Sequence, residues 1–129
     1  MNRFPFELQT AESLIMLECL ANDEAASLAL DTGASHTTLD LSFLIISGVD
    51  RMDATGSVWM ETAIGPVEAK TFKVKSLTAL GITKHDFEVC AYDFLSHNIF
   101  TDIDGMLGLD FFRGLDLNIS FKRFEIEVG

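Results

Sequence analysis

The sequence predicts an all-β fold, closed or sandwiched, and two features of the chain carry this prediction. Short apolar runs recur along the 129 residues, with polar or glycine-containing turns between them. Phe124, Ile126 and Val128 alternate with Glu125 and Glu127, which is the period-two pattern of a strand with one buried face. Segments with a helical pattern are short and few.

The strands are predicted from the apolar runs and the turn signals beside them. A polar turn at residues 22–24 separates the first two runs, and Gly65-Pro66 is a turn signal between two later ones. Phe72 and Val74 alternate with lysines, which indicates a half-buried strand. In chain order the predicted strands are residues 13–20, 25–30, 56–64, 67–75, 87–92, 115–119 and 124–128.

Two short helices are predicted. Asp40 is an N-cap residue for a helix over residues 41–46, which Gly48 would end. A second helix is predicted over residues 109–113 and would end at Gly114.

Length and charge narrow the classes of function. A chain of 129 residues is expected to form a single domain, residues 1–129. Nine Lys and Arg against 20 Asp and Glu give a net charge of −11, which disfavours nucleic acid as a partner. The longest stretch without a charged residue is 41–49, and a membrane-spanning helix needs about 20 apolar residues. No membrane partner is therefore expected.

The compartment is predicted from the N-terminus and the cysteines. Residues 1–7 have no apolar core before the first acid, so they do not read as a secretory signal. Cys19 and Cys90 lie far apart, each in an apolar run, and form no C-x-x-C motif. We expect two buried reduced thiols in a cytoplasmic protein, with a disulfide between them as the alternative.

One segment points to chemistry. An apolar strand, Leu28-Ala29-Leu30, ends in Asp31-Thr32-Gly33-Ala34-Ser35. The simplest interpretation is a strand followed by a turn in which Asp31 accepts hydrogen bonds from local amides. A tripeptide of this kind is a weak signal alone, but a second motif follows.

That second motif is Met106-Leu107-Gly108, two apolar residues and a glycine, followed by a short helical segment. In this order the two motifs resemble the retropepsin-like aspartic proteases, in which the first strand carries the catalytic acid and the second crosses beside it. The resemblance spans about residues 13–128. It implies a closed β-barrel with a flap hairpin and one or two short helices.

The resemblance implies a role for each matched residue. Asp31 would be the catalytic acid, with Thr32 holding the loop across a subunit boundary and Gly33 leaving room for substrate. Ala34 would contact substrate and Ser35 would support the loop. Met106, Leu107 and Gly108 would be structural residues of the site. The flap tip would be at residues 54–57, so Thr55, Gly56 and Ser57 are predicted to bind substrate.

The chemistry needs two carboxylates, and the chain offers one Asp-Thr-Gly. Asp102, Asp104 and Asp110 all lie outside a second motif of that kind. The economical solution is a homodimer in which Asp31 of each subunit meets its copy on the two-fold axis. The prediction is therefore an aspartic endopeptidase acting on peptides or proteins. No cofactor and no metal are expected, since the chain has no H-E-x-x-H motif.

Departures from the retroviral pattern leave other interpretations open. An acid and an arginine that form an ion pair in retroviral members are replaced by Ser35 and Leu109, which suggests a non-viral, bacterial-type branch. The flap has one glycine, and Trp59 either covers the cleft or belongs to the core. The alternatives are a peptide- or protein-binding module without proteolysis, and a β domain in which Asp31 is only a turn residue.

Overall fold

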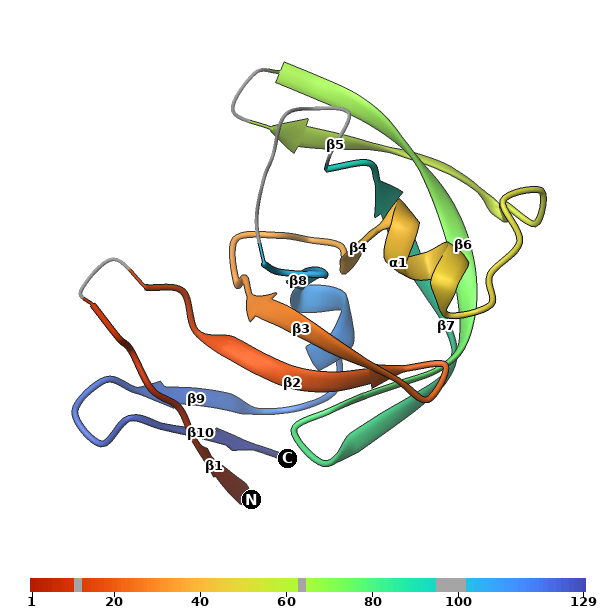
Figure 1. The fold of residues 1–129 in the computed structure, drawn as a ribbon. Helices are drawn as coiled ribbons and strands as arrows, with labels where there is room; N and C mark the ends of the chain where they lie inside the picture. The colour runs from red at the N-terminus through yellow and green to blue at the C-terminus, as the bar shows by residue number, and fades with distance from the viewer. Residues whose placement is uncertain (11–12, 63–64, 95–101) are drawn as a thin grey trace.

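A computed structural model of the chain describes residues 1–10, 13–62, 65–94 and 102–129. Strands dominate these residues, as the sequence predicts (Figure 1). The strands are β1 (Asn2–Pro5), β2 (Met16–Ala21), β3 (Glu24–Leu30), β4 (Thr38–Asp40), β5 (Gly56–Thr62), β6 (Gly65–Ala79), β7 (Ile82–Tyr92), β8 (Gly105–Leu107), β9 (Leu117–Ser120) and β10 (Glu125–Val128). The helices are α1 (Leu41–Ile46) and the 3₁₀ helix η1 (Leu109–Phe112).

Six strands form a closed barrel in the order β2, β3, β8, β4, β7 and β6. The barrel closes because β2 also pairs with β6, where Leu20 lies opposite Thr78 and Ala21 lies opposite Leu77. The pairs β3–β8 and β4–β7 are parallel, whereas the other pairs of the barrel are antiparallel. Among the described strands, β5 pairs with β6 alone and extends beyond the barrel as a hairpin arm (Figure 1). The all-β closed barrel is thus confirmed.

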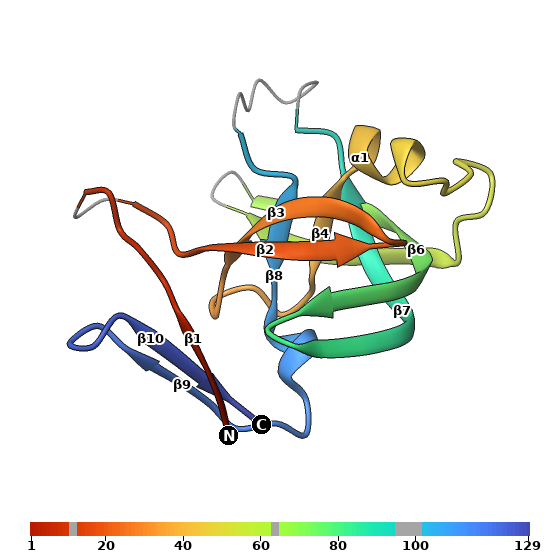
Figure 2. The ribbon, with the colours of Figure 1, turned by 60° about the horizontal axis from the view of Figure 1, so that its bottom comes forward.

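The two ends of the chain form a second sheet. β1, β10 and β9 pair in that order, all antiparallel, beside the barrel (Figure 2). Ile126 and Val128 of β10 are buried, as the alternating pattern predicts, and both belong to the main hydrophobic core. β1 has no apolar alternation of this kind, which is why it was not among the predicted strands.

The helix over residues 41–46 is confirmed with its predicted cap. The Asp40 carboxylate accepts a hydrogen bond from the Phe43 amide at 3.4 Å, and Gly48 follows with a φ of 104°. Asp40 also accepts a bond from the Phe94 amide at 3.3 Å, so one carboxylate joins α1 to the end of β7. The second predicted helix is a single 3₁₀ turn that ends at Phe112, one residue early. Within the described part of the chain, neither helix has the length and hydropathy of a membrane span.

The largest correction concerns the long β6–β7 hairpin. β6 continues to Ala79 and β7 begins at Ile82, so residues 76–86 are strand and turn where no strand was predicted. The turn uses Leu80 and Gly81 with φ values of 51° and 71°, a left-handed pair that matches the twist of a hairpin. Leucine rarely adopts a positive φ, so the residue types at this position do not predict a turn. Gly65-Pro66 is not a turn but the start of β6, paired with β5.

Both cysteines are buried and neither forms a disulfide, as expected for reduced thiols. Burial raises the pKa of Cys19 to about 12, and the nearby Glu18 charge adds to the effect. Burial likewise raises the pKa of Cys90 to about 11, with smaller contributions from Asp110 and Glu88. Neither thiol is therefore a reactive thiolate at neutral pH.

Candidate active site

Asp31 lies directly after β3, at the point where that strand stops pairing with β8. Leu30 is opposite Leu107 in this parallel pair, and the Asp31 amide donates to the Leu107 carbonyl at 3.0 Å. The half-buried Asp31 carboxylate accepts a hydrogen bond from the Gly33 amide at 3.0 Å, which orients it within the loop. A side chain at residue 33 would put its Cβ only 3.3 Å from this carboxylate oxygen. Because residue 33 is a glycine, the space beside the Asp31 carboxylate stays open.

Met106-Leu107-Gly108 crosses beside Asp31, as the resemblance implies. Leu107 is fully buried under the crossing, and the Leu109 amide after Gly108 donates to the Ala34 carbonyl at 2.8 Å. A Cβ on Gly108 would lie 2.7 Å from the His36 carbonyl carbon and 2.9 Å from the Ala34 oxygen. Two backbone segments therefore approach each other here as closely as a glycine permits.

Asp110 fixes the far end of the same loop, a role that the sequence did not reveal. Both of its carboxylate oxygens accept the Thr37 amide, at 2.9 and 3.0 Å, and one accepts the Thr37 hydroxyl at 2.7 Å. The Thr37 hydroxyl in turn accepts the Gly108 amide at 3.1 Å. The sequence signal for this role is one acid two residues after the apolar-apolar-Gly motif, and its type and spacing do not identify Thr37 as its partner.

A cavity of about 410 Å³ opens above this loop, and Asp31 is part of its lining. Of the predicted site residues, the cavity brings together Asp31, Gly33, Ala34, Ser35 and Met106. Thr32 is exposed, and its hydroxyl forms no hydrogen bond with the residues that the structure describes. The other lining residues are His36, Thr38, Trp59 and Met60.

The predicted position of the flap tip is wrong, although the hairpin itself is present. Gly56 pairs with Thr71 and Thr62 pairs with Gly65, so residues 54–57 lie at the end of β5 that is far from its connection to β6; that connection, residues 63–64, is outside the described part. Thr55 lies at the base, where its hydroxyl contacts the Thr71 hydroxyl at 2.8 Å. The estimate from sequence distance failed because the loop after α1 takes up residues that we assigned to the hairpin.

The hairpin reaches the cavity through the middle of β5 instead. Trp59 and Met60 line the cavity, whereas Thr55, Gly56 and Ser57 are not among its described lining residues. The Met60 sulfur lies 3.7 Å from the Thr38 hydroxyl, which joins β5 to β4. Trp59 is 69% exposed, so its assignment to the core is wrong and its assignment to the cleft is confirmed.

Two of the three acids considered as a second catalytic group, Asp104 and Asp110, accept hydrogen bonds elsewhere. Asp110 is occupied by Thr37, and the Asp104 carboxylate accepts the Ser27 amide at 2.9 Å. Asp31 is the one carboxylate among the described residues that line the cavity. No group of three or more His, Cys, Asp or Glu side chains able to hold a metal ion occurs within residues 1–10, 13–62, 65–94 and 102–129.

A comparison with protein families decides the assignment. The aspartyl protease family model matches residues 17–111, most of the barrel and both motifs. The chain belongs to the aspartyl protease family. Among curated proteins no relative is similar enough to count as a match.

Solved structures of aspartic proteases share the fold at low sequence identity. A retropepsin-like aspartic protease from Rickettsia conorii superposes with a TM-score of 0.70 at 14% identity, over 98% of this chain and 89% of that one. EIAV protease in complex with the inhibitor HBY-793 superposes with a TM-score of 0.62 at 18% identity, over 83% of this chain and 92% of that one. The retropepsin-like fold of this aspartyl protease family member is therefore confirmed.

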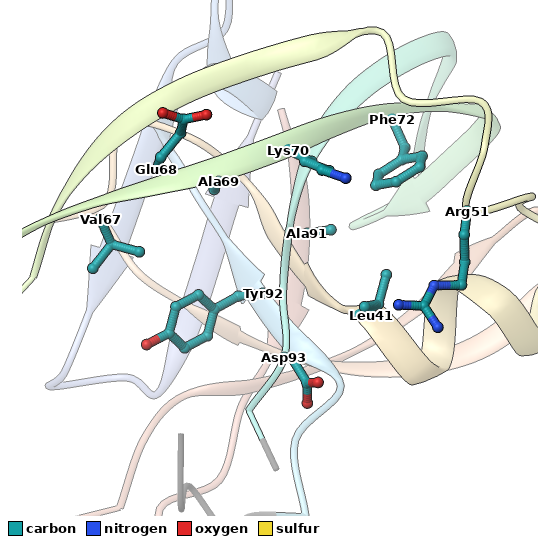
Figure 3. Close-up of a pocket in the computed structure, with 10 residues that line it drawn as sticks. All are labelled: Leu41, Arg51, Val67, Glu68, Ala69, Lys70, Phe72, Ala91, Tyr92 and Asp93. Carbon is teal, nitrogen blue, oxygen red and sulfur yellow. The ribbon is translucent and has the colours of Figure 1, made fainter. Parts of the chain in front are cut away.

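A second groove, of about 290 Å³, lies away from the Asp31 loop between the start of α1, β6 and the end of β7 (Figure 3). Its floor includes Leu41 and the buried Phe72, with Arg51, Lys70 and Asp93 around it. None of the predicted site residues lines this groove, so the candidate active site is the cavity beside Asp31.

Proposed function

We propose that this protein is an aspartic endopeptidase that is active as a homodimer, with Asp31 of each subunit forming the catalytic dyad. One observation carries the proposal: the cavity beside the aspartyl protease motif holds a single carboxylate among its described lining residues. Asp31 lies at an exposed loop that leaves space beside the acid at Gly33. A second copy of the chain supplies the missing acid without any change of the fold.

The dyad divides two tasks between identical groups. Two carboxylates in contact cannot both ionise cheaply, so the pair holds one proton between them. The ionised acid accepts a proton from a bound water, which attacks the carbonyl carbon of the peptide bond. The neutral acid donates its proton to the carbonyl oxygen, which gives a tetrahedral diol. As the C–N bond breaks, the acid that took the water proton gives it to the amine nitrogen, and one diol hydroxyl returns a proton to the other acid.

The surrounding residues support this chemistry in the proposed dimer. The exposed Thr32 hydroxyl is free to bond across the subunit boundary, and Ala34 and Ser35 line the peptide path. An extended peptide would lie between the Asp31 loop and the β5–β6 hairpin, adding a strand to the hairpin by backbone hydrogen bonds. Trp59 and Met60 would contact its side chains from the hairpin.

The substitution Asp31→Asn tests the proposal. It keeps the acceptor oxygen for the Gly33 amide but removes the charge, so we expect a folded dimer that no longer cleaves peptides. Asp53→Asn is the matched control, because Asp53 is exposed and lies outside the cavity. Peptide cleavage is followed by mass spectrometry, and the fold by circular dichroism. Cleavage that persists in purified Asp31→Asn protein would exclude the dyad.

A second candidate function is a peptide-binding module without turnover. It is favoured by Ser35 and the 47% exposed Leu109, which stand where retroviral members have an ion pair beside the site. This alternative predicts that a transition-state mimic of the pepstatin type and extended peptides bind at equal strength, with no hydrolysis. A dyad predicts much tighter binding of the mimic, because its hydroxyl takes the place of the attacking water.

We propose a cytoplasmic location from the state of the two cysteines. Both cysteines are free and buried, which is the usual state in a reducing compartment such as the cytoplasm.

A further inference from the structure

His36 is the second ionisable side chain of the cavity. Among the described residues that line it, Asp31 and His36 are the two with an ionisable side chain, and the remainder are small, apolar or hydroxyl-bearing. His36 is half-buried and lines the cavity. The catalysis proposed above makes no use of this ring.

The backbone around His36 is held on both sides. The Ala34 carbonyl accepts the Leu109 amide at 2.8 Å, and Thr37 is fixed by three hydrogen bonds to Asp110. Gly108 packs directly against the His36 carbonyl group, where no side chain would fit. A ring on a backbone held in this way is pre-organised, so binding a ligand costs little conformational entropy.

One ring nitrogen is already engaged. The Nδ1 atom lies 2.8 Å from the Ser35 hydroxyl oxygen, and no described residue bonds to Nε2. When the Ser35 hydroxyl donates to Nδ1, the proton of the neutral ring is on Nε2. When the ring is protonated, Nδ1–H donates to Ser35 and Nε2–H is again a donor. In these two states Nε2 offers a proton, and in the second it also offers positive charge. In the third state, a neutral ring with its proton on Nδ1, the Nε2 atom is an acceptor.

We propose that His36 makes this cleft select peptides with an acidic side chain near the scissile bond, through an Nε2–H bond to the carboxylate. The inference rests on the proposed peptidase function and adds a substrate class to it. This preference is opposite to the one that net charge alone predicts, because a chain with a net charge of −11 attracts basic peptides in general. In a homodimer each subunit contributes one His36, so two symmetric positions on either side of the cleaved bond are expected to show the preference.

The test compares peptides that differ in one residue. An uncharged peptide that the protein cleaves is varied by placing Glu, Gln or Lys at each position within four residues of the cleaved bond. At one position, or at a symmetric pair, we expect kcat/KM for Glu to exceed that for Gln by about fivefold, the size of one partly exposed charged hydrogen bond. In His36→Gln protein we expect the Glu-to-Gln ratio of kcat/KM to fall to about one. His85 is an exposed residue of β7, and His85→Gln protein is expected to keep the native ratio.

A binding measurement separates this inference from the proposed function. Trp59 is the single tryptophan of the chain and lines the cavity, so its fluorescence reports occupancy. Peptides with a reduced, uncleavable bond are titrated in Glu and Gln forms against the native protein. If no peptide is cleaved but the Glu form binds more tightly, the peptidase proposal fails and the role of His36 stands. Equal kcat/KM and equal Kd for Glu and Gln at every position, or a preference for Lys, would overturn the role of His36.

Discussion

At the scale of single residues, Asp110 is the side chain that sequence reasoning misjudged most. Its carboxylate accepts hydrogen bonds from the Thr37 amide and the Thr37 hydroxyl, and the Thr37 side chain is completely buried. A motif search finds Asp31 because its neighbours have recognisable types. Asp110 acts through a partner 73 residues away, and only the fold reveals that pair. Its role is to position the loop that carries Ser35 and His36.

The substitution Asp110→Ala is expected to destabilise the protein. It leaves the buried Thr37 amide and hydroxyl without their acceptor, which costs about 1–3 kcal/mol. The free energy of unfolding is measured by urea titration, with Asp53→Ala as an exposed control that we expect to change it by less than about 0.5 kcal/mol. Equal stability of the two variants would show that the Thr37 contacts contribute nothing.

The two buried thiols predict a loss of stability in alkaline solution. The pKa of Cys19 rises to about 12 and that of Cys90 to about 11 in the folded state, against 9.0 for an ordinary thiol. Above pH 9 the unfolded chain releases thiol protons that the folded chain retains, so the free energy of unfolding falls with rising pH. Each thiol contributes at most about 1.4 kcal/mol per pH unit.

Urea titrations between pH 8 and pH 11 measure this slope. The doubly substituted C19A/C90A protein keeps the lysine and tyrosine titrations but lacks the thiols, so its slope is expected to be shallower. Identical slopes for the two proteins would contradict the pKa shifts.

At the scale of helices and strands, sequence reasoning predicts those whose own residues carry a capping or alternation pattern. The cap at Asp40 placed α1 with its bounds, and the alternation of Phe72 and Val74 with lysines placed the inner face of β6. β4 was missed because it has three residues and is defined by pairing with β7 and β8, far away in the chain. The flap was misplaced for a related reason: the register of a hairpin depends on partners, which sequence distance does not give.

The crossing of β8 beside the Asp31 loop predicts that Gly108→Ala is poorly tolerated. The new methyl group would meet the backbone of His36 and Ala34 at 2.7 to 2.9 Å, so the crossing must open. We expect the free energy of unfolding to fall by about 1–3 kcal/mol or more, and peptide cleavage to be lost. Gly56→Ala is the matched control, because its methyl group would meet the Thr71 hydroxyl at an ordinary 3.6 Å. Gly108→Ala protein as stable as Gly56→Ala protein would contradict this packing.

At the scale of the whole molecule, the described lining of the cavity holds one carboxylate, and the proposed dyad needs two. Two copies would carry −22, twice the −11 of one chain, and this repulsion weakens association at low ionic strength. The interface must therefore gain enough from apolar burial to overcome it, and assembly would be favoured by salt. Peptide cleavage is accordingly best assayed at high protein concentration and about 0.5 M salt, where the Debye length is only a few ångströms.

The most direct measurement mixes native and Asp31→Asn subunits at constant total concentration and follows peptide cleavage after exchange. A dyad shared between subunits needs native Asp31 on both sides, so activity falls with the square of the native fraction. An equal mixture then keeps about a quarter of the activity. If the site were completed within one chain, activity would fall in proportion to the native fraction, and an equal mixture would keep about half of it. The quadratic curve is the predicted result, and a straight line would contradict the shared dyad.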